Sequence, residues 1–228
     1  MTVLRYSLWL LLLALHGCAL QPPAQFYQLQ DGAPPLPAAD QGPALLLGPL
    51  QLADYLQREN LVQRQADDSL SLSQEARWAG SLQDDVGQLL LRQLASRLQT
   101  SRIALYPDRV GFDNQLQAVL SISRLDSGAS QPARLQAQWR LLDGQGQLRG
   151  SRLLSLQAEH DGTARDQVRA QSELLQQLAA ELAAAIRALP PSTPPPRPGK
   201  RAPAAKAGSG SAPAPLPPVL QAPGRISF

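Results

Sequence analysis

Strict alternation of apolar and polar residues in the middle of the chain constrains the fold most strongly. From residue 133 to 141 every odd position is apolar, and every even position is Arg or Gln. Residues 116–122 carry their apolar side chains at the even positions. Because successive side chains of a strand face opposite ways, both segments predict a sheet with one buried and one solvated face. The turn residues at 143–146 (DGQG) make residues 148–158 the predicted hairpin partner, which completes a three-strand antiparallel meander.

Two other segments repeat their apolar residues at steps of three and four, which is typical of amphipathic helices. The first follows Ser81 and Asp84, a pair that resembles a capping box, and is expected to end near Thr100. The second begins after Thr163 and is stopped by the prolines at 190 and 191. Short strands are expected near residues 25–29, 44–52, 61–62, 70–72 and 103–106. The predicted fold class is α/β with α+β character, a mixed, largely antiparallel sheet with the two helices packed on it.

A short apolar run precedes the single cysteine of the chain. Residues 7–15 (SLWLLLLAL) follow Arg5 and lead into His16-Gly17-Cys18. The run is shorter than the ~20 residues that a membrane-spanning helix needs, and it has the n-region and h-region of a signal peptide. We therefore expect residues 1–17 to be a lipoprotein signal, removed before Cys18, and Cys18 to carry acyl chains such as palmitate. The alternative, a buried thiol at the end of a core helix, leaves Pro22 and Pro23 unexplained.

The remaining chain divides into three predicted regions. Residues 18–42 are expected to form the lipid anchor and linker, residues 43–189 the folded domain, and residues 190–228 a disordered tail. The tail holds 12 of the 21 prolines and cannot bury enough apolar surface to offset its conformational entropy. It also carries five basic residues and no acid, whereas residues 18–189 have a net charge of −3. A concentrated basic face on the fold is absent from this pattern, so nucleic-acid binding is not expected.

The residues that catalysis would need are scarce. His16 would leave with the signal, and His160 alone cannot complete a zinc site or a Ser-His-Asp triad. The acidic pair at 84–85 lies in the first turn of the predicted helix, where carboxylates interact favourably with the helix dipole. The sequence therefore predicts no enzyme, no metal and no cofactor.

Candidate contact residues lie in two places. A predicted exposed loop at residues 53–58 combines Asp54, Tyr55 and Arg58, a composition suited to an interface, and we expect these residues to be structural or partner-contacting. Arg77 and Trp78 stand just before the first helix. Trp78 either packs that helix onto the sheet or belongs to a docking surface, and both alternatives stay open.

Several phrases in order resemble one family, and together they cover nearly all of residues 26–189. They are FYQL at 26–29, LGPLQLADYL at 47–56, LVQR at 61–64, RWAGSL at 77–82, YP at 106–107 and AQWRLLDGQG at 137–146. This pattern is similar to the PqiC-like lipoproteins, the auxiliary lipoprotein components of ABC-type transport.

The resemblance implies a non-catalytic lipoprotein that works with a periplasmic MCE-domain protein in lipid transport between membranes. It would sit on the periplasmic face of the outer membrane, because Ala19 follows the lipidated cysteine in place of the inner-membrane retention signal Asp. Self-association into a homo-oligomer is a further expectation. Two other functions remain open: a structural envelope lipoprotein whose basic tail contacts the cell wall, and a periplasmic lipid-binding module.

Overall fold

The predicted meander forms one side of an eight-stranded sheet. In the computed structural model, which describes residues 23–38, 40–108 and 110–190, its strands are β6 (Leu116–Gly128), β7 (Gln131–Asp143) and β8 (Leu148–Ala158). All pair antiparallel, with Leu120 opposite Trp139 and Trp139 opposite Arg152. Trp139 is buried, as its position in the alternation predicts. The α+β fold class is confirmed.

Two different strands pair with the other edge of β6. The first half pairs in parallel with β2 (Leu45–Leu52), and the far end pairs with β3 (Asn60–Arg64). A single turn of 3-10 helix, η1 (Asp54–Leu56), takes the chain from β2 to β3. Beyond β2 lies β5 (Ile103–Leu105). Beyond β3 come β4 (Leu70–Trp78) and β1 (Gln25–Tyr27), so β1 and β8 lie at opposite margins of the sheet.

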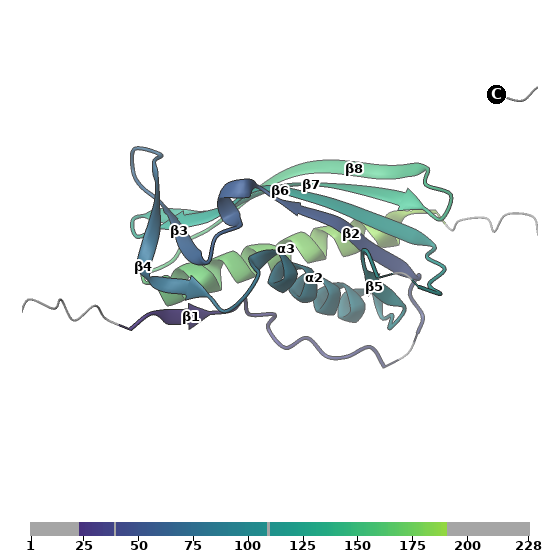
Figure 1. Cartoon of the computed structure of the whole chain (residues 1–228). Helices are drawn as coiled ribbons and strands as arrows, with labels where there is room; N and C mark the ends of the chain where they lie inside the picture. Colours follow the sequence, from purple (N-terminus) through teal and green to yellow (C-terminus); the bar gives the residue numbers. More distant parts are fainter. Residues whose placement is uncertain (1–22, 39, 109, 191–228) are drawn as a thin grey trace, which may run out of the picture. The chain divides into compact units, whose positions relative to one another are not determined.

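Two helices cover one face of this sheet (Figure 1). They are α2 (Leu82–Leu98) and α3 (Ala164–Ala188). The side chains of Ser81 and Thr163 cap them by accepting hydrogen bonds from the N–H groups of Asp84 and Asp166. Both predicted helix starts are therefore confirmed. The helix stripes and the inward positions of the meander form one apolar core, with fully buried residues that include Leu90, Leu94, Leu120, Leu135 and Leu178.

Two strands are longer than the sequence pattern predicts. β6 continues for six residues past Ile122, because a register shift between Ile122 and Arg124 breaks the alternation without ending the strand. β4 runs on to Trp78, so Arg77 and Trp78 lie on a strand instead of in a connection before the helix. Both extensions occur where the sheet divides.

The segment between β1 and β2 is fixed to the outer sides of both helices. The N–H of Leu29 donates to Asp85 on α2, and the N–H of Gln30 donates to Ser172 on α3. Asp31 adds an ion pair with Arg92. The fold therefore begins at β1, earlier than residue 43, where the sequence pattern places its start. Residues 25–31, 41 and 42, all within the predicted linker region 18–42, make contacts with the fold.

Candidate functional site

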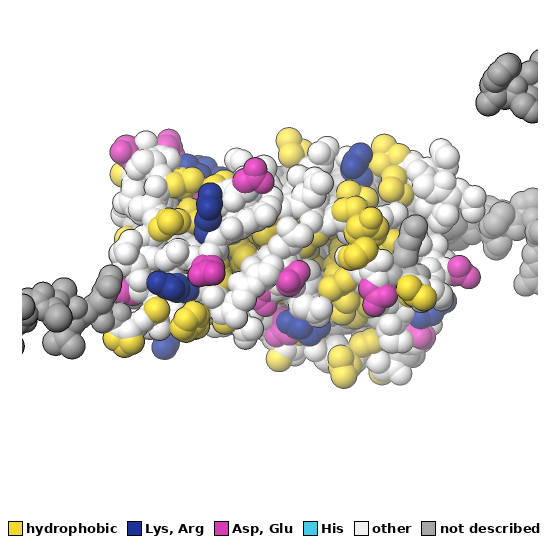
Figure 2. Space-filling model, viewed as in Figure 1, with side chains coloured by type: hydrophobic (Ala, Val, Ile, Leu, Met, Phe, Trp, Pro, Cys, Tyr) yellow, Lys and Arg dark blue, Asp and Glu magenta, His cyan; other side chains and the backbone are white. Residues whose placement is uncertain are grey.

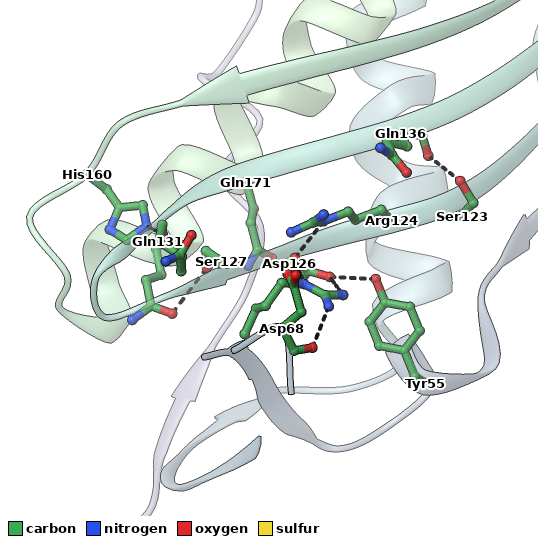
Figure 3. Close-up of polar contacts among 12 residues, drawn as sticks. Tyr55, Asp68, Ser123, Arg124, Asp126, Ser127, Gln131, Gln136, His160 and Gln171 are labelled. Atoms are coloured by element: carbon green, nitrogen blue, oxygen red, sulfur yellow. Dashed lines mark hydrogen bonds and ion pairs between the residues drawn. The ribbon is translucent and has the colours of Figure 1, made fainter. Parts of the chain in front are cut away.

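A buried carboxylate lies where the neighbour of β6 changes from β2 to β3, and it connects the segments that meet there. Asp126, near the end of β6, has no exposed surface. Arg64 from β3 donates to both of its oxygens, at 2.7 and 3.1 Å. Arg124 donates at 2.9 Å, and the Tyr55 hydroxyl of η1 donates at 2.7 Å (Figure 3). One carboxylate thus fastens η1 and β3 to β6.

The protonation equilibria of this cluster follow from its geometry. Burial alone would raise the pKa of Asp126, but the hydrogen bonds from Arg64 and Tyr55 and the charge of Arg124 hold that pKa below its ordinary value. Burial raises the pKa of Tyr55, and its hydrogen bond to the ionised Asp126 raises it further. At neutral pH the cluster therefore contains a charged carboxylate, two guanidinium groups and a neutral phenol.

A chain of polar side chains continues from the cluster to α3. Ser127 donates to Gln167 at 3.1 Å and accepts from Gln171 at 3.0 Å. Gln63 of β3 also donates to Gln167, at 3.3 Å. These contacts tie the end of β6 to the helix beneath it. A side chain on Gly128 would overlap the carbonyl oxygen of Arg64, so the close approach of β6 and β3 requires glycine there.

The hydrogen bonds to Asp126 fix the short connection between η1 and β3. Tyr55 and Arg64 are bound to the same carboxylate, so the residues between them are held at both ends. The N–H of Trp78 donates to the carbonyl of Glu59 at 2.7 Å, which attaches this connection to β4 as well. Arg58 and Glu59 are therefore set beside Arg77 and Trp78.

An open groove of about 760 Å³ lies at this junction. Its walls come from β1, from the connection before β3, from the end of β4 and from the start of α2. The lining side chains used below are Phe26, Arg58, Glu59, Arg77, Trp78 and Leu82. Figure 2 shows basic and hydrophobic side chains next to each other over the region of β1 and β4. The groove thus combines an apolar floor with cationic groups.

The positive charge of the groove is not neutralised within the described part of the chain. Neither Arg58 nor Arg77 takes part in the ion pairs found there. The Nε of Arg77 is buried and has no hydrogen-bond partner. Glu59 is the one acid in the lining, so one positive charge is in excess. The start of α2 adds N–H groups without partners inside the helix, but Ser81 already accepts from the N–H of Asp84, and the carboxylates of Asp84 and Asp85 offset the positive end of the helix dipole.

The structure divides the five predicted contact residues into two groups. Arg58, Arg77 and Trp78 meet in the groove, although 18 positions separate Arg58 from Arg77 by number. Asp54 is exposed and does not line it. Tyr55 is half-buried and donates to Asp126, so within the predicted exposed loop this residue has a structural role, while Arg58 is exposed.

Two components of the site have no strong signal in the sequence. Phe26 lies in a three-residue strand remote from the rest of the groove, and only the parallel pairing of β1 with β4 brings it there. Asp126 stands beyond Ile122, where a register shift interrupts the alternation of β6.

The other candidates for chemistry have structural roles. His160 accepts a hydrogen bond from the N–H of Gly162 through Nδ1, and its Nε2 contacts the Gln131 carbonyl at 2.9 Å (Figure 3). In residues 23–38, 40–108 and 110–190, no group of His, Cys, Asp and Glu has a geometry suited to a metal ion. The helices of this part are not long and apolar enough to cross a membrane. Cys18, His16, the predicted signal and the tail from residue 191 lie outside the described residues.

Comparisons with known proteins identify relatives of the chain. Residues 27–183 match the model of a family described as ABC-type transport auxiliary lipoprotein component. The solved structure of an uncharacterized protein aligns with a TM-score of 0.59 and 20% identity, over 72% of this chain and 99% of its own. A Xanthomonas campestris protein of the family DUF330 aligns with a TM-score of 0.57 and 19% identity, over 70% and 93%. These two likenesses establish the fold. A search of curated proteins finds no significant match.

Replacing Asp126 by Asn is expected to lower the free energy of unfolding by about 3 kcal/mol, because two partly buried guanidinium groups lose their counter-charge. The folded-state pKa of Asp126 is lowered, so the wild-type stability that it provides is present above the unfolded pKa and is lost as the pH falls. The variant should therefore lose less stability between about pH 7 and about pH 3. Urea unfolding at the two pH values measures both effects.

The control for this experiment is Asp113→Asn, since Asp113 is exposed and forms no side-chain hydrogen bond within the described chain. Its unfolding free energy should stay within about 0.5 kcal/mol of wild type. Equal stabilities for the two variants would contradict the role given to Asp126.

Proposed function

Because the chain belongs to the family of ABC-type transport auxiliary lipoprotein components, we propose that it is the non-catalytic lipoprotein of an MCE-type lipid-transport system. It is anchored through Cys18 to the outer membrane, faces the periplasm and contacts an MCE-domain protein. The observation that carries the proposal is the family match, which runs from the end of β1 to the last turns of α3. The PqiC-like resemblance of the sequence is confirmed by this match.

The sequence before the fold supports the anchoring step. The apolar run, the Gly17-Cys18 junction and the absence of any other cysteine agree with a lipobox. Each buried CH₂ of an acyl chain contributes about 0.8 kcal/mol, and two or more chains hold a protein stably on a bilayer. Ala19 after the cysteine favours outer-membrane sorting.

The nature of the fold supports an auxiliary role without chemistry. The Asp126 cluster within it is satisfied by ion pairs and hydrogen bonds that fix strands to one another. The exposed features are surfaces, and the groove beside α2, of about 760 Å³, is one of them. A surface suits docking to a partner or to lipid.

The two alternative functions require different features of the chain. A structural envelope lipoprotein would hold the cell wall through the basic tail, residues 190–228. A periplasmic lipid-binding module would need an internal cavity, whereas Leu90, Leu120 and Leu178 fill the space between helices and sheet. Both alternatives therefore have less support than the transport role.

Replacement of Cys18 by Ala is expected to remove the protein from the outer-membrane fraction, because the cysteine carries the only predicted acyl anchor. Density-gradient fractionation of the envelope measures the location, and mass spectrometry of the wild-type mature chain should give the mass of the acylated form. Asp113→Asn is the control and should fractionate as wild type does. A wild-type mature chain with an unmodified thiol would refute the anchor.

Deletion of residues 191–228 separates the transport role from the structural alternative. If the chain serves lipid transport, the truncated protein stays in the outer membrane and still cross-links to an MCE-domain protein. Cross-linking in intact cells followed by mass spectrometry of the captured partner makes the measurement. Loss of envelope retention on truncation, with no MCE-domain partner for the full chain, would favour cell-wall attachment instead.

A further inference from the structure

The groove lies at the end of the fold where the anchored segment enters. β1 is the first strand, and its central residue, Phe26, is 66% exposed while lining the groove. Gln25 is the seventh residue after Cys18, and a chain of that length spans at most about 25 Å. If Cys18 is anchored as proposed above, the groove stays within that distance of the bilayer surface.

The cationic groups of the groove fit a phosphate ester. A guanidinium presents planar N–H donors that match phosphate oxygens, and Arg58 and Arg77 offer two such groups from different segments. The buried Nε of Arg77 still lacks an acceptor. The beginning of α2, at Ser81 and Leu82, forms part of the same lining.

The size and the remaining side chains of the groove indicate more than a free ion. A volume of about 760 Å³ is far larger than one phosphate requires. Phe26 is exposed, and the small exposed parts of Trp78 and Leu82, both otherwise buried in the core, complete the apolar contacts for a glycerol ester or the first part of an acyl chain. Since Glu59 leaves a single excess positive charge, the lining matches a headgroup with one negative charge.

We propose that this groove binds the headgroup of an anionic phospholipid of the bilayer to which the chain is anchored. The phosphodiester lies between Arg58 and Arg77, and the exposed ring of Phe26 enters the interfacial region of the membrane. The inference rests on the proposed anchoring at Cys18. Headgroup binding adds a second, specific contact to the acyl attachment, and it orients the groove toward the membrane.

The test uses the full mature chain, inserted through its acyl groups into vesicles of phosphatidylcholine. Phosphatidylglycerol brominated near the head of its acyl chains is titrated into these vesicles, and brominated phosphatidylcholine is titrated in parallel. Bromine quenches nearby tryptophan, so fluorescence reports lipid at Trp78. We expect quenching by phosphatidylglycerol at several-fold lower mole fraction than by phosphatidylcholine. Trp78→Phe should abolish the difference, because Trp78 lines the groove whereas Trp139 does not.

Arg58→Gln and Arg77→Gln should each weaken the apparent affinity for phosphatidylglycerol on the order of tenfold, the usual effect of losing a hydrogen bond to a charged group. Arg58 is exposed, so its replacement leaves the fold intact even if that of the half-buried Arg77 does not. Arg140→Gln is the matched control. Arg140 is exposed on β7 and forms no ion pair within the described chain, and its replacement should change nothing.

Three results would overturn the proposal. Equal quenching by the two lipids would exclude a headgroup site. Loss of the preference on adding excess inorganic phosphate would identify a free-anion site. Equal effects of the Arg58, Arg77 and Arg140 variants would show general surface attraction or a peptide partner elsewhere. A chain that inserts but shows no preference refutes the groove alone, whereas a mature chain that cannot insert refutes the anchoring itself.

Discussion

One buried carboxylate, Asp126, determines how the sheet divides and what it presents at its surface. Taking a charge out of water is costly, and the cost is met here by two guanidinium groups and a phenol that arrive from three segments. Because Tyr55 and Arg64 bind the same group, the residues between them have little freedom. The connection that carries Arg58 is held against β4 for this reason. The groove therefore results from the contacts of Tyr55 and Arg64 with Asp126.

The arrangement relates three features that are distant in sequence. β1 carries Phe26 in from the anchored side, the clamped connection supplies Arg58, and the end of β4 supplies Arg77 and Trp78. In this fold β1, the first described strand, forms a wall of the groove. Anchoring and headgroup binding would then act at one end of the protein, which leaves the solvated face of β6, β7 and β8 for contacts with other proteins.

Much of the fold follows from local patterns, whereas the site depends on long-range pairing. Alternation predicts β7 and β8, and the capping residues Ser81 and Thr163 predict where the helices begin. These signals are local, and the core reinforces them. The sequence pattern does not predict the continuation of β6 past Ile122, because a register shift reverses which residues face inward. Arg58, Arg77 and Trp78 stand out by composition, but only the pairing of β3 with β4 shows that they meet.

The orientation of the groove toward the bilayer is tested most directly by spin labels on the acylated chain in vesicles. A nitroxide at Phe26→Cys, on β1, is compared with one at Leu153→Cys, an exposed residue at the opposite margin of the sheet. Acylation of Cys18 leaves each variant with one free thiol. The account predicts that the label at position 26 has the oxygen and nickel-chelate accessibilities of the headgroup region, while the label at position 153 is in water. Two labels with the same aqueous accessibility would contradict it.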